Sequence, residues 1–278
     1  MPPAPFPALP RPLLFGHRGA SAKAPENTLN AFELAVGAGA DVLELDVHLS
    51  RDGVVVVHHD ARVDRTTNGN GNVKGFLYSE LRALDAGYRF VDAAGEHSFR
   101  ERGCQIPRLS DVLAAFPGRG FNIEVKQAEP PMLHAVFDVL ERAGASDVVL
   151  AAADEGIMRA IEAAQPGVAL GMSSAECWRF WWQAMLGRTP REFEGRCLQV
   201  PPYHYGVLPV TSRRVVKAAH EAGVEVHVWT VNDPREAAHW LARGVDGVMS
   251  DDPGAIVHAV RSARQAAREQ LERRGRVR

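Results

Sequence analysis

Three acidic side chains stand at positions from which strand periodicity would point them to one side of a sheet. In VLELDVHL, residues 42–49, Glu44 and Asp46 alternate with apolar residues, and in FNIEVK, residues 121–126, Glu124 does the same. Successive side chains of a strand point to opposite faces, so the acids share a face. Carboxylates that converge in a protein interior repel one another unless a cation or protons offset their charge. We therefore expect these three acids to hold one divalent metal ion, Mg²⁺ or Ca²⁺, since both prefer oxygen ligands.

Two histidines and two basic residues flank these acids. The loop GHRGASAKAPENT, residues 16–28, supplies His17 and Arg18. His59 directly follows another strand candidate, and Lys126 ends a third. An imidazole can give or take a proton near neutral pH, so a pair of them beside a metal suits general acid and base catalysis. Fixed positive charge stabilises a phosphate diester and its transition state. The set predicts metal-dependent phosphodiester hydrolysis, with His17 and His59 as the catalytic pair and the two basic residues on the phosphate.

The elements that must position these residues follow a βα rhythm, in which short Val/Ile/Leu runs alternate with alanine-rich helical patterns. This predicts an α/β fold, a TIM-type (β/α)8 barrel. The expected helices include Thr28–Ala38, Pro131–Ala143, Ser212–Ala222 and Pro234–Ala242. The expected strands are Leu13–His17, Val42–Leu49, Val54–His58, Phe121–Lys126, Val148–Ala151, Val168–Met172, Cys197–Val200, Val224–Thr230 and Gly247–Ser250.

Nine strand candidates are one too many for an eight-stranded barrel. We expect Val54–His58 to be the return arm of a hairpin, because Asp52-Gly53 between two apolar runs is a strong signal for a tight turn. A turn centred there would place Asp46 opposite His59.

Polar faces of the strands should converge inside the barrel. The outer face of every strand in a parallel barrel meets helices, so the apolar set points outward and the polar set lines the lumen. VEVHVWT, residues 224–230, shows the same alternation, and its Trp229 would either line the pocket against the substrate or fill the core. Barrel active sites lie at the C-terminal ends of the strands. The loop after the first strand therefore also brings Glu26 and Asn27 to that mouth as supporting residues.

Composition limits the partners and the compartment. The formal net charge of -2 provides no broad electrostatic field for nucleic acid or an anionic membrane. Three cysteines at wide spacing argue against a disulfide framework and favour a reducing compartment. The first 12 residues hold six prolines and no long apolar run, which is unlike a signal peptide or a membrane span. We expect a flexible arm there, and a cytoplasmic protein that is a monomer or a homodimer.

We expect a single domain over residues 13–262. Two stretches of the chain do not follow the βα pattern. Residues 61–108 have little periodicity and read as a small insertion after the His59-Asp60 hairpin arm, whereas the basic residues 263–278 read as a C-terminal helix or tail.

An aromatic segment, CWRFWWQAML at residues 177–186, predicts a helix with Trp178, Trp181 and Trp182 near one face. Such a helix packs on the barrel or at a subunit contact. Alternatively it forms a platform near the mouth that makes weak contact with an acyl chain or a membrane, since tryptophan favours such interfaces.

Taken together, these motifs resemble those of the glycerophosphodiester phosphodiesterases, and they run in that family's order over nearly the whole chain. The matching pieces are GHRGASAKAPENT at 16–28, LELDVHLSRDGVVVVHHDARVDRTTNG at 43–69, NIEVK at 122–126, VHVWTVND at 226–233 and GVDGVMSDDP at 244–253. One departure is Ser250-Asp251-Asp252-Pro253, where family members often carry Thr-Asp-Arg-Pro.

The resemblance implies a TIM-type barrel, the metal ligands and catalytic histidines named above, phosphate binding by Arg18 with Lys126, and Glu26 beside the metal ligands. It also implies cleavage of deacylated phospholipids into sn-glycerol 3-phosphate and an alcohol. The alternative is a lysophospholipase D or another phospholipase-type phosphodiesterase that acts on a lipid. A barrel kept only as a binding module would be expected to lack one of the five central residues, and all five are present.

Overall fold

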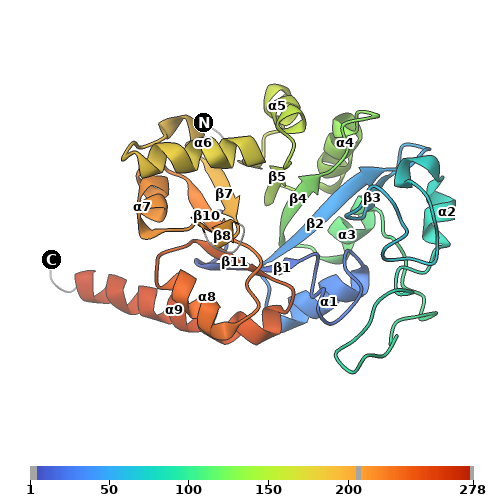
Figure 1. Ribbon diagram of the computed structural model, residues 1–278, viewed down its shortest axis with the longest axis horizontal. Helices are drawn as coiled ribbons and strands as arrows, with labels where there is room; N and C mark the ends of the chain where they lie inside the picture. Colours follow the sequence, from blue (N-terminus) through green and yellow to red (C-terminus); the bar gives the residue numbers. More distant parts are fainter. Residues whose placement is uncertain (1–4, 205–207, 276–278) are drawn as a thin grey trace.

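Eight parallel strands close into a barrel in the computed structural model, which describes residues 5–204 and 208–275 (Figure 1). Around the barrel each strand pairs with the next, and the last pairs with β1, so the sheet has no free edge. The predicted TIM-type (β/α)8 barrel is confirmed. In order around the barrel, the strands are β1 (Leu13–His17), β2 (Val42–Leu49), β4 (Gly120–Val125), β5 (Val148–Ala151), β6 (Ala169–Gly171), β7 (Arg196–Val200), β10 (Glu225–Val228) and β11 (Gly247–Ser250).

Helices connect these strands and cover the outside of the barrel (Figure 1). Local sequence sets their ends, as α1 illustrates: the Thr28 hydroxyl accepts a hydrogen bond from the amide of Ala31, and Gly39 ends the helix at φ 99°. The covering helices are α1 (Leu29–Ala38), α3 (Leu109–Ala115), α4 (Leu133–Ala143), α5 (Glu155–Ala164), α6 (Ser174–Met185), α7 (Arg213–Glu221), α8 (Pro234–Leu241) and α9 (Pro253–Gly275).

The two faces of each strand meet different surroundings, as the alternation predicts. Leu43 and Leu45 of β2 point outward and are fully buried in one cluster with Phe32 of α1 and Leu109 of α3. Inside the barrel, the part near the N-terminal ends of the strands is apolar and is filled by Phe15 and other small or apolar side chains. The polar side chains are thereby left at the opposite end, where barrel active sites lie.

The predicted hairpin exists, but its register differs by one residue from our expectation. β3 (Val55–Val57) runs antiparallel to β2, and Val47 lies opposite Val57. Asp46 is therefore paired with His58, whose amide donates to the Asp46 carbonyl at 2.9 Å, and not with His59. The loop holds three residues instead of two: Ser50 bonds Val54 across it, and the third loop residue, Gly53, has φ +80°. That extra residue shifts the pairing.

The expected flexible arm is also wrong for residues 5–12, which dock on the closed end of the barrel. Phe6 is 1% exposed, and its ring centroid lies 6.0 Å from that of Phe15. Arg11 donates to Glu225 Oε1 at 2.6 Å and to carbonyls of the arm itself. An apolar surface at the barrel end and one half-buried acid thus fix this proline-rich segment. The first four residues lie outside the described range.

The segment between β3 and α3 forms a small subdomain with its own core of Val63, Val73, Leu81, Cys104 and Ile106. It contains α2 (Tyr78–Arg82) and a 3₁₀ turn at Val73–Gly75. Two further short elements flank β7 in the chain. A second 3₁₀ turn, Arg191–Phe193, precedes it, and a hairpin of β8 (Tyr203–His204) and β9 (Leu208–Pro209) follows it.

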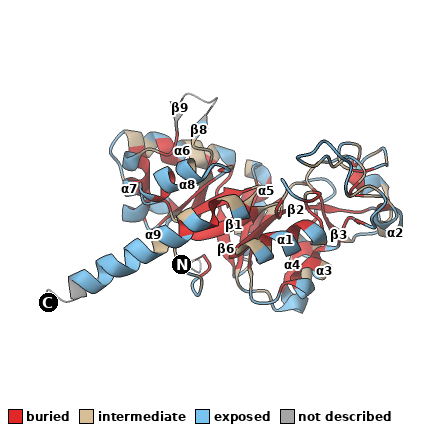
Figure 2. Ribbon diagram, turned by 90° about the horizontal axis from the view of Figure 1, so that it is seen from below, coloured by how far each residue is buried: buried red, intermediate tan, exposed pale blue. Residues whose placement is uncertain are grey.

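The basic C-terminal segment continues α9, whose last described turns project from the body with an exposed surface (Figure 2). Arg264 on this helix donates to the Pro12 carbonyl at 2.8 Å. Among the described residues, no helix combines the length and the apolar content needed to cross a lipid bilayer.

Candidate active site

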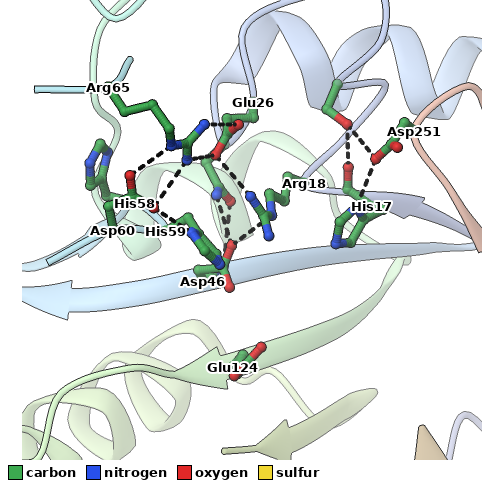
Figure 3. Close-up of polar contacts among 12 residues, drawn as sticks. His17, Arg18, Glu26, Asp46, His58, His59, Asp60, Arg65, Glu124 and Asp251 are labelled. Carbon is green, nitrogen blue, oxygen red and sulfur yellow. Dashed lines mark hydrogen bonds and ion pairs between the residues drawn. The ribbon is translucent and has the colours of Figure 1, made fainter. Parts of the chain in front are cut away.

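A cavity of about 360 Å³ opens at the C-terminal mouth of the barrel, and eight residues singled out by the sequence line it. Most of them lie on or directly after the neighbouring strands β1, β2 and β4, so residues distant in the chain meet there (Figure 3). The eight residues are His17, Arg18, Glu44, Asp46, His59, Glu124, Lys126 and Trp229.

The three acids lie together because of strand register. Asp46 of β2 pairs with Glu124 of β4, and Glu44 sits two positions earlier on the same face of β2. One carboxylate oxygen from each acid lies within 4.8 Å of the other two. Glu44 and Asp46 are buried, at 4% and 1% exposure. Lys126 Nζ bridges the group, at 3.0 Å from Asp46 Oδ1 and 2.8 Å from Glu124 Oε2.

Burial and mutual repulsion both disfavour the charged forms of the clustered acids. Loss of solvent and the nearby charge of Asp46 raise the pKa of Glu44 to about 7. Burial alone would also raise the pKa of Asp46, but the positive charges of Lys126 and Arg18 lower it. An additional cation would stabilise the ionised form of Glu44, and carboxylate oxygens suit a hard divalent ion. The donor set therefore fits such an ion.

His17 is held by an acid from the other end of the chain. Its Nδ1 donates to Asp251 Oδ1 at 2.7 Å, and its Nε2 lies 4.0 Å from Glu44 Oε2. Asp251 also accepts from Asn232 Nδ2 at 2.9 Å and from the Ser21 hydroxyl at 2.8 Å. Burial alone would lower the pKa of His17, but the bond to Asp251 and the charge of Glu44 raise it. Burial would raise the pKa of Asp251, and its hydrogen bonds instead lower it to about 2.

His59 has a matching partner in the next residue. Its Nδ1 donates to Asp60 Oδ1 at 2.6 Å, and Arg65 Nε donates to Asp60 Oδ2 at 2.7 Å (Figure 3). The ring of His48 lies 3.1 Å from the His59 carbonyl oxygen, which fixes the backbone of the catalytic candidate. Both cavity histidines thus use Nδ1 to bond an acid, which leaves Nε2 as the nitrogen available for chemistry.

The loop between β1 and α1 connects these parts. Glu26 accepts from both terminal nitrogens of Arg65, at 2.6 and 2.8 Å, and from Arg18 at 3.1 Å. Asn27 donates to Asp46 Oδ2 at 2.9 Å. Gly19 permits this tight loop: it has φ +87°, and a Cβ there would lie 2.6 Å from backbone of α1. Glu26 therefore orients Arg18, and Asn27 orients Asp46.

Sequence reasoning missed several polar residues that the fold brings to the site. Asp251 lies in the Ser-Asp-Asp-Pro segment, where neither strand alternation nor spacing indicates a role, and Arg65 lies in an aperiodic stretch. Gln199 and Asn122 line the cavity and bond each other at 2.8 Å. Asn122 was not missed in position, because the alternation in residues 121–126 already points it into the lumen with Glu124.

A closed (β/α)8 barrel with clustered acids, two His–Asp pairs and fixed positive charge at its mouth is typical of an enzyme that carries out acid–base chemistry on an anionic substrate. Comparison with known proteins narrows this class. The profile of the glycerophosphoryl diester phosphodiesterase family matches residues 17–255. The chain belongs to this family, and it is accordingly a phosphodiesterase.

Individual relatives and solved structures support the same family assignment. A glycerophosphodiester phosphodiesterase of Caldanaerobacter subterraneus is 33% identical over 260 residues, which are 90% of this chain and 98% of the relative. The solved glycerophosphodiester phosphodiesterase of Agrobacterium tumefaciens superposes with a TM-score of 0.71 at 30% identity, covering 88% of this chain and 98% of that one. A phosphodiesterase of Oleispira antarctica, solved with the product sn-glycerol-3-phosphate, gives 0.73 at 28% identity, covering 90% and 97%.

Proposed function

We propose that this enzyme hydrolyses glycerophosphodiesters to sn-glycerol 3-phosphate and an alcohol, with Glu44, Asp46 and Glu124 holding one divalent ion, Mg²⁺ or Ca²⁺. The observation that carries the proposal is that one cavity is lined by three carboxylates and by two histidines, each bonded through Nδ1 to an acid. The Oleispira relative, solved with the product named above, supports the choice of glycerol phosphate.

The divalent ion, when bound, would supply positive charge to the non-bridging phosphate oxygens. The side chains of the protein bind and orient the substrate. Arg18 and Lys126 add fixed positive charge around the phosphate, and Trp229 packs against the organic part of the substrate. Asn27 and Glu26 keep Asp46 and Arg18 in place.

His17 and His59 move the protons. As the attacking oxygen bonds to phosphorus and the bond from phosphorus to the alcohol oxygen breaks, one imidazole takes the proton of the attacking hydroxyl at Nε2. The other, protonated beforehand, gives its Nε2 proton to the leaving oxygen. The acids on Nδ1 hold each ring in the tautomer and orientation that this exchange needs. The attacking group is water or the neighbouring hydroxyl of the substrate glycerol. In the second case the alcohol leaves with formation of a cyclic phosphate, and water then opens this ring in a second step to give sn-glycerol 3-phosphate.

The proposal is tested by incubating the purified protein with glycerophosphocholine and glycerophosphoethanolamine while glycerol 3-phosphate is measured. Turnover should stop with EDTA and return with Mg²⁺ or Ca²⁺, and His17→Ala should abolish it. ³¹P NMR separates a direct product from a cyclic phosphate. Full turnover in chelator, or an unchanged rate in His17→Ala, would sink the mechanism.

A lysophospholipase D activity is the second candidate, and a second, apolar cavity beside the active site favours it. We also propose the cytoplasm as the compartment. Cys104, Cys177 and Cys197 form no disulfide, which suits a reducing environment.

A further inference from the structure

We propose that an apolar cavity next to the active site binds an unbranched alkyl chain carried by the substrate, so that the enzyme prefers chain-bearing phosphodiesters. The inference rests on the proposed function and specifies its substrate class. It assigns a binding role to the aromatic helix α6 and to the segment that follows β7.

The cavity measures about 270 Å³, well above the roughly 150 Å³ of an engineered apolar cavity that holds benzene. Its described lining contains only uncharged side chains. Most are apolar and closely packed: Trp181, Val200, Val210 and Val215 are each no more than 8% exposed. The full described lining is Ser174, Cys177, Trp178, Trp181, Leu198, Gln199, Val200, Pro201, Val210, Val215 and Trp229.

Continuity with the active site identifies the occupant. Ser174, Cys177, Gln199 and Trp229 line both this cavity and the one that holds the acids and histidines. Trp229 stands at the boundary between the two and is 40% exposed. An organic group attached to a phosphate at the barrel mouth can therefore pass Trp229 and enter the apolar cavity without crossing the protein. A separate ligand would instead compete with the substrate for the shared walls.

The chemistry of the walls favours an alkyl chain over a quaternary ammonium group. Aromatic rings attract such a cation, but the described lining offers no carboxylate to balance its charge. Leu198, Val200, Val210 and Val215 add branched aliphatic walls. Burying an alkyl chain against them is favourable in proportion to the apolar area removed from water. The cavity is also distinct from a membrane-facing platform, because the most exposed tryptophan of α6, Trp182 at 59%, is absent from its lining.

The test uses two substrate series, one with alcohols of two to ten carbons on glycerophosphate and one with alkyl ethers of the same lengths on the sn-1 oxygen of glycerophosphocholine. In one series, kcat/KM should rise about threefold for each added methylene until the cavity is full, mainly through KM. The series that shows the rise tells which side of the phosphate carries the chain. A flat response in both, with the two-carbon substrate still hydrolysed, would overturn the chain subsite while leaving the proposed function intact.

Variants connect the rise to this cavity. Trp178→Ala removes one wall, and Val210→Phe fills part of the space, so both should reduce the gain to below about 1.5-fold per methylene. Trp182→Ala is the matched control: it removes a tryptophan of the same helix outside the cavity and should keep the gain. Equal loss in Trp182→Ala and Trp178→Ala would refute the cavity in favour of a general surface effect. A different outcome would assign the cavity to a cation instead. In that case kcat/KM would not change along the alkyl series but would be higher for glycerophosphocholine than for glycerophosphoethanolamine, and only Trp178→Ala would lose this difference.

Binding gives a readout that needs no turnover. Calorimetric titration with ethyl, hexyl and decyl phosphate should show affinity that rises with chain length and a heat capacity change that becomes more negative. Trp178→Ala should reduce both trends. Equal affinities for the three phosphates would exclude the subsite even if the protein hydrolysed none of the substrates offered.

Discussion

His17 at the end of the first strand and Asp251 just after the last one form a hydrogen bond of 2.7 Å that joins the two ends of the barrel sheet at the active site. Because β1 and β11 are adjacent, barrel closure itself creates this pair. Asp251 in turn is fixed by Asn232 and Ser21. The proton chemistry proposed for His17 therefore depends on the closed sheet and on an acid 234 residues away.

Replacing Asp251 should change the pH dependence of activity. A carboxylate that accepts from Nδ1 stabilises the protonated imidazole, so Asp251→Asn should lower the pKa of His17. The limb of the kcat/KM profile that reports His17 should move to lower pH whether His17 acts as the acid or the base. The rate near neutrality should fall about 10- to 100-fold. Asp252→Asn, one residue on and paired with the surface Lys23, is the control. A lower rate with an unmoved profile would contradict this role.

Glu44 should destabilise the protein when no metal is bound. Its pKa is raised from 4.5 to about 7 in the fold by burial and by Asp46. The folded state thus binds the proton more tightly than the unfolded chain, and stability declines as pH rises from about 4.5 through 7. Glu44→Gln removes this effect, so in EDTA it should be more stable than the parent by on the order of 1–2 kcal/mol at pH 8 and about equal at pH 4.5.

Adding a divalent ion should reverse that order. At about 100 times its dissociation constant the ion should stabilise the parent by about 2.7 kcal/mol and Glu44→Gln by much less. Thermal unfolding in EDTA and in Mg²⁺ or Ca²⁺ measures both effects, with Glu33→Gln on the exposed face of α1 as control. An equal shift in the parent and in Glu44→Gln would remove Glu44 from the ligand set.

Much of this site could be predicted because strand alternation is a local rule. The alternation in VLELDVHL places Glu44 and Asp46 on one face of the strand. Helices cover the apolar face, so the acidic face points into the barrel. Hairpin register was harder, since Asp-Gly occurs in loops of two and of three residues and only the conformation of Gly53 decides.

The Asp251 pair and the docked arm depend on tertiary closure, which leaves no periodic signal. Asp251 meets His17 only because β1 and β11 are neighbours in the closed sheet. The proline-rich arm docks because the barrel end offers an apolar surface to Phe6, and composition alone could not reveal that surface.

Arg65 should support catalysis through His59. It holds both Asp60 and Glu26, and Glu26 also holds Arg18. Arg65→Met should therefore loosen the second His–Asp pair and lower kcat about tenfold, with a smaller change in KM. The nearby Arg62→Met is a fitting control, because Arg62 pairs with Asp64 away from the cavity. If the two variants had equal steady-state kinetics, the network would have no role in turnover.

The docked arm should stabilise the fold without serving the chemistry. Phe6→Ala would empty a fully buried site against Phe15 and should lower the free energy of unfolding by about 2–3 kcal/mol, which corresponds to a fall of at least about 5 °C in Tm. Because Arg11 and Glu225 place the arm at the end of the strands opposite the mouth, kcat/KM at 25 °C should change less than about twofold. Leu34→Ala, at a 46% exposed position on α1, should shift Tm far less. An unchanged Tm in Phe6→Ala would mean that the arm does not stay docked in solution, and a large loss of activity at full folding would mean that the closed end of the barrel acts on its mouth.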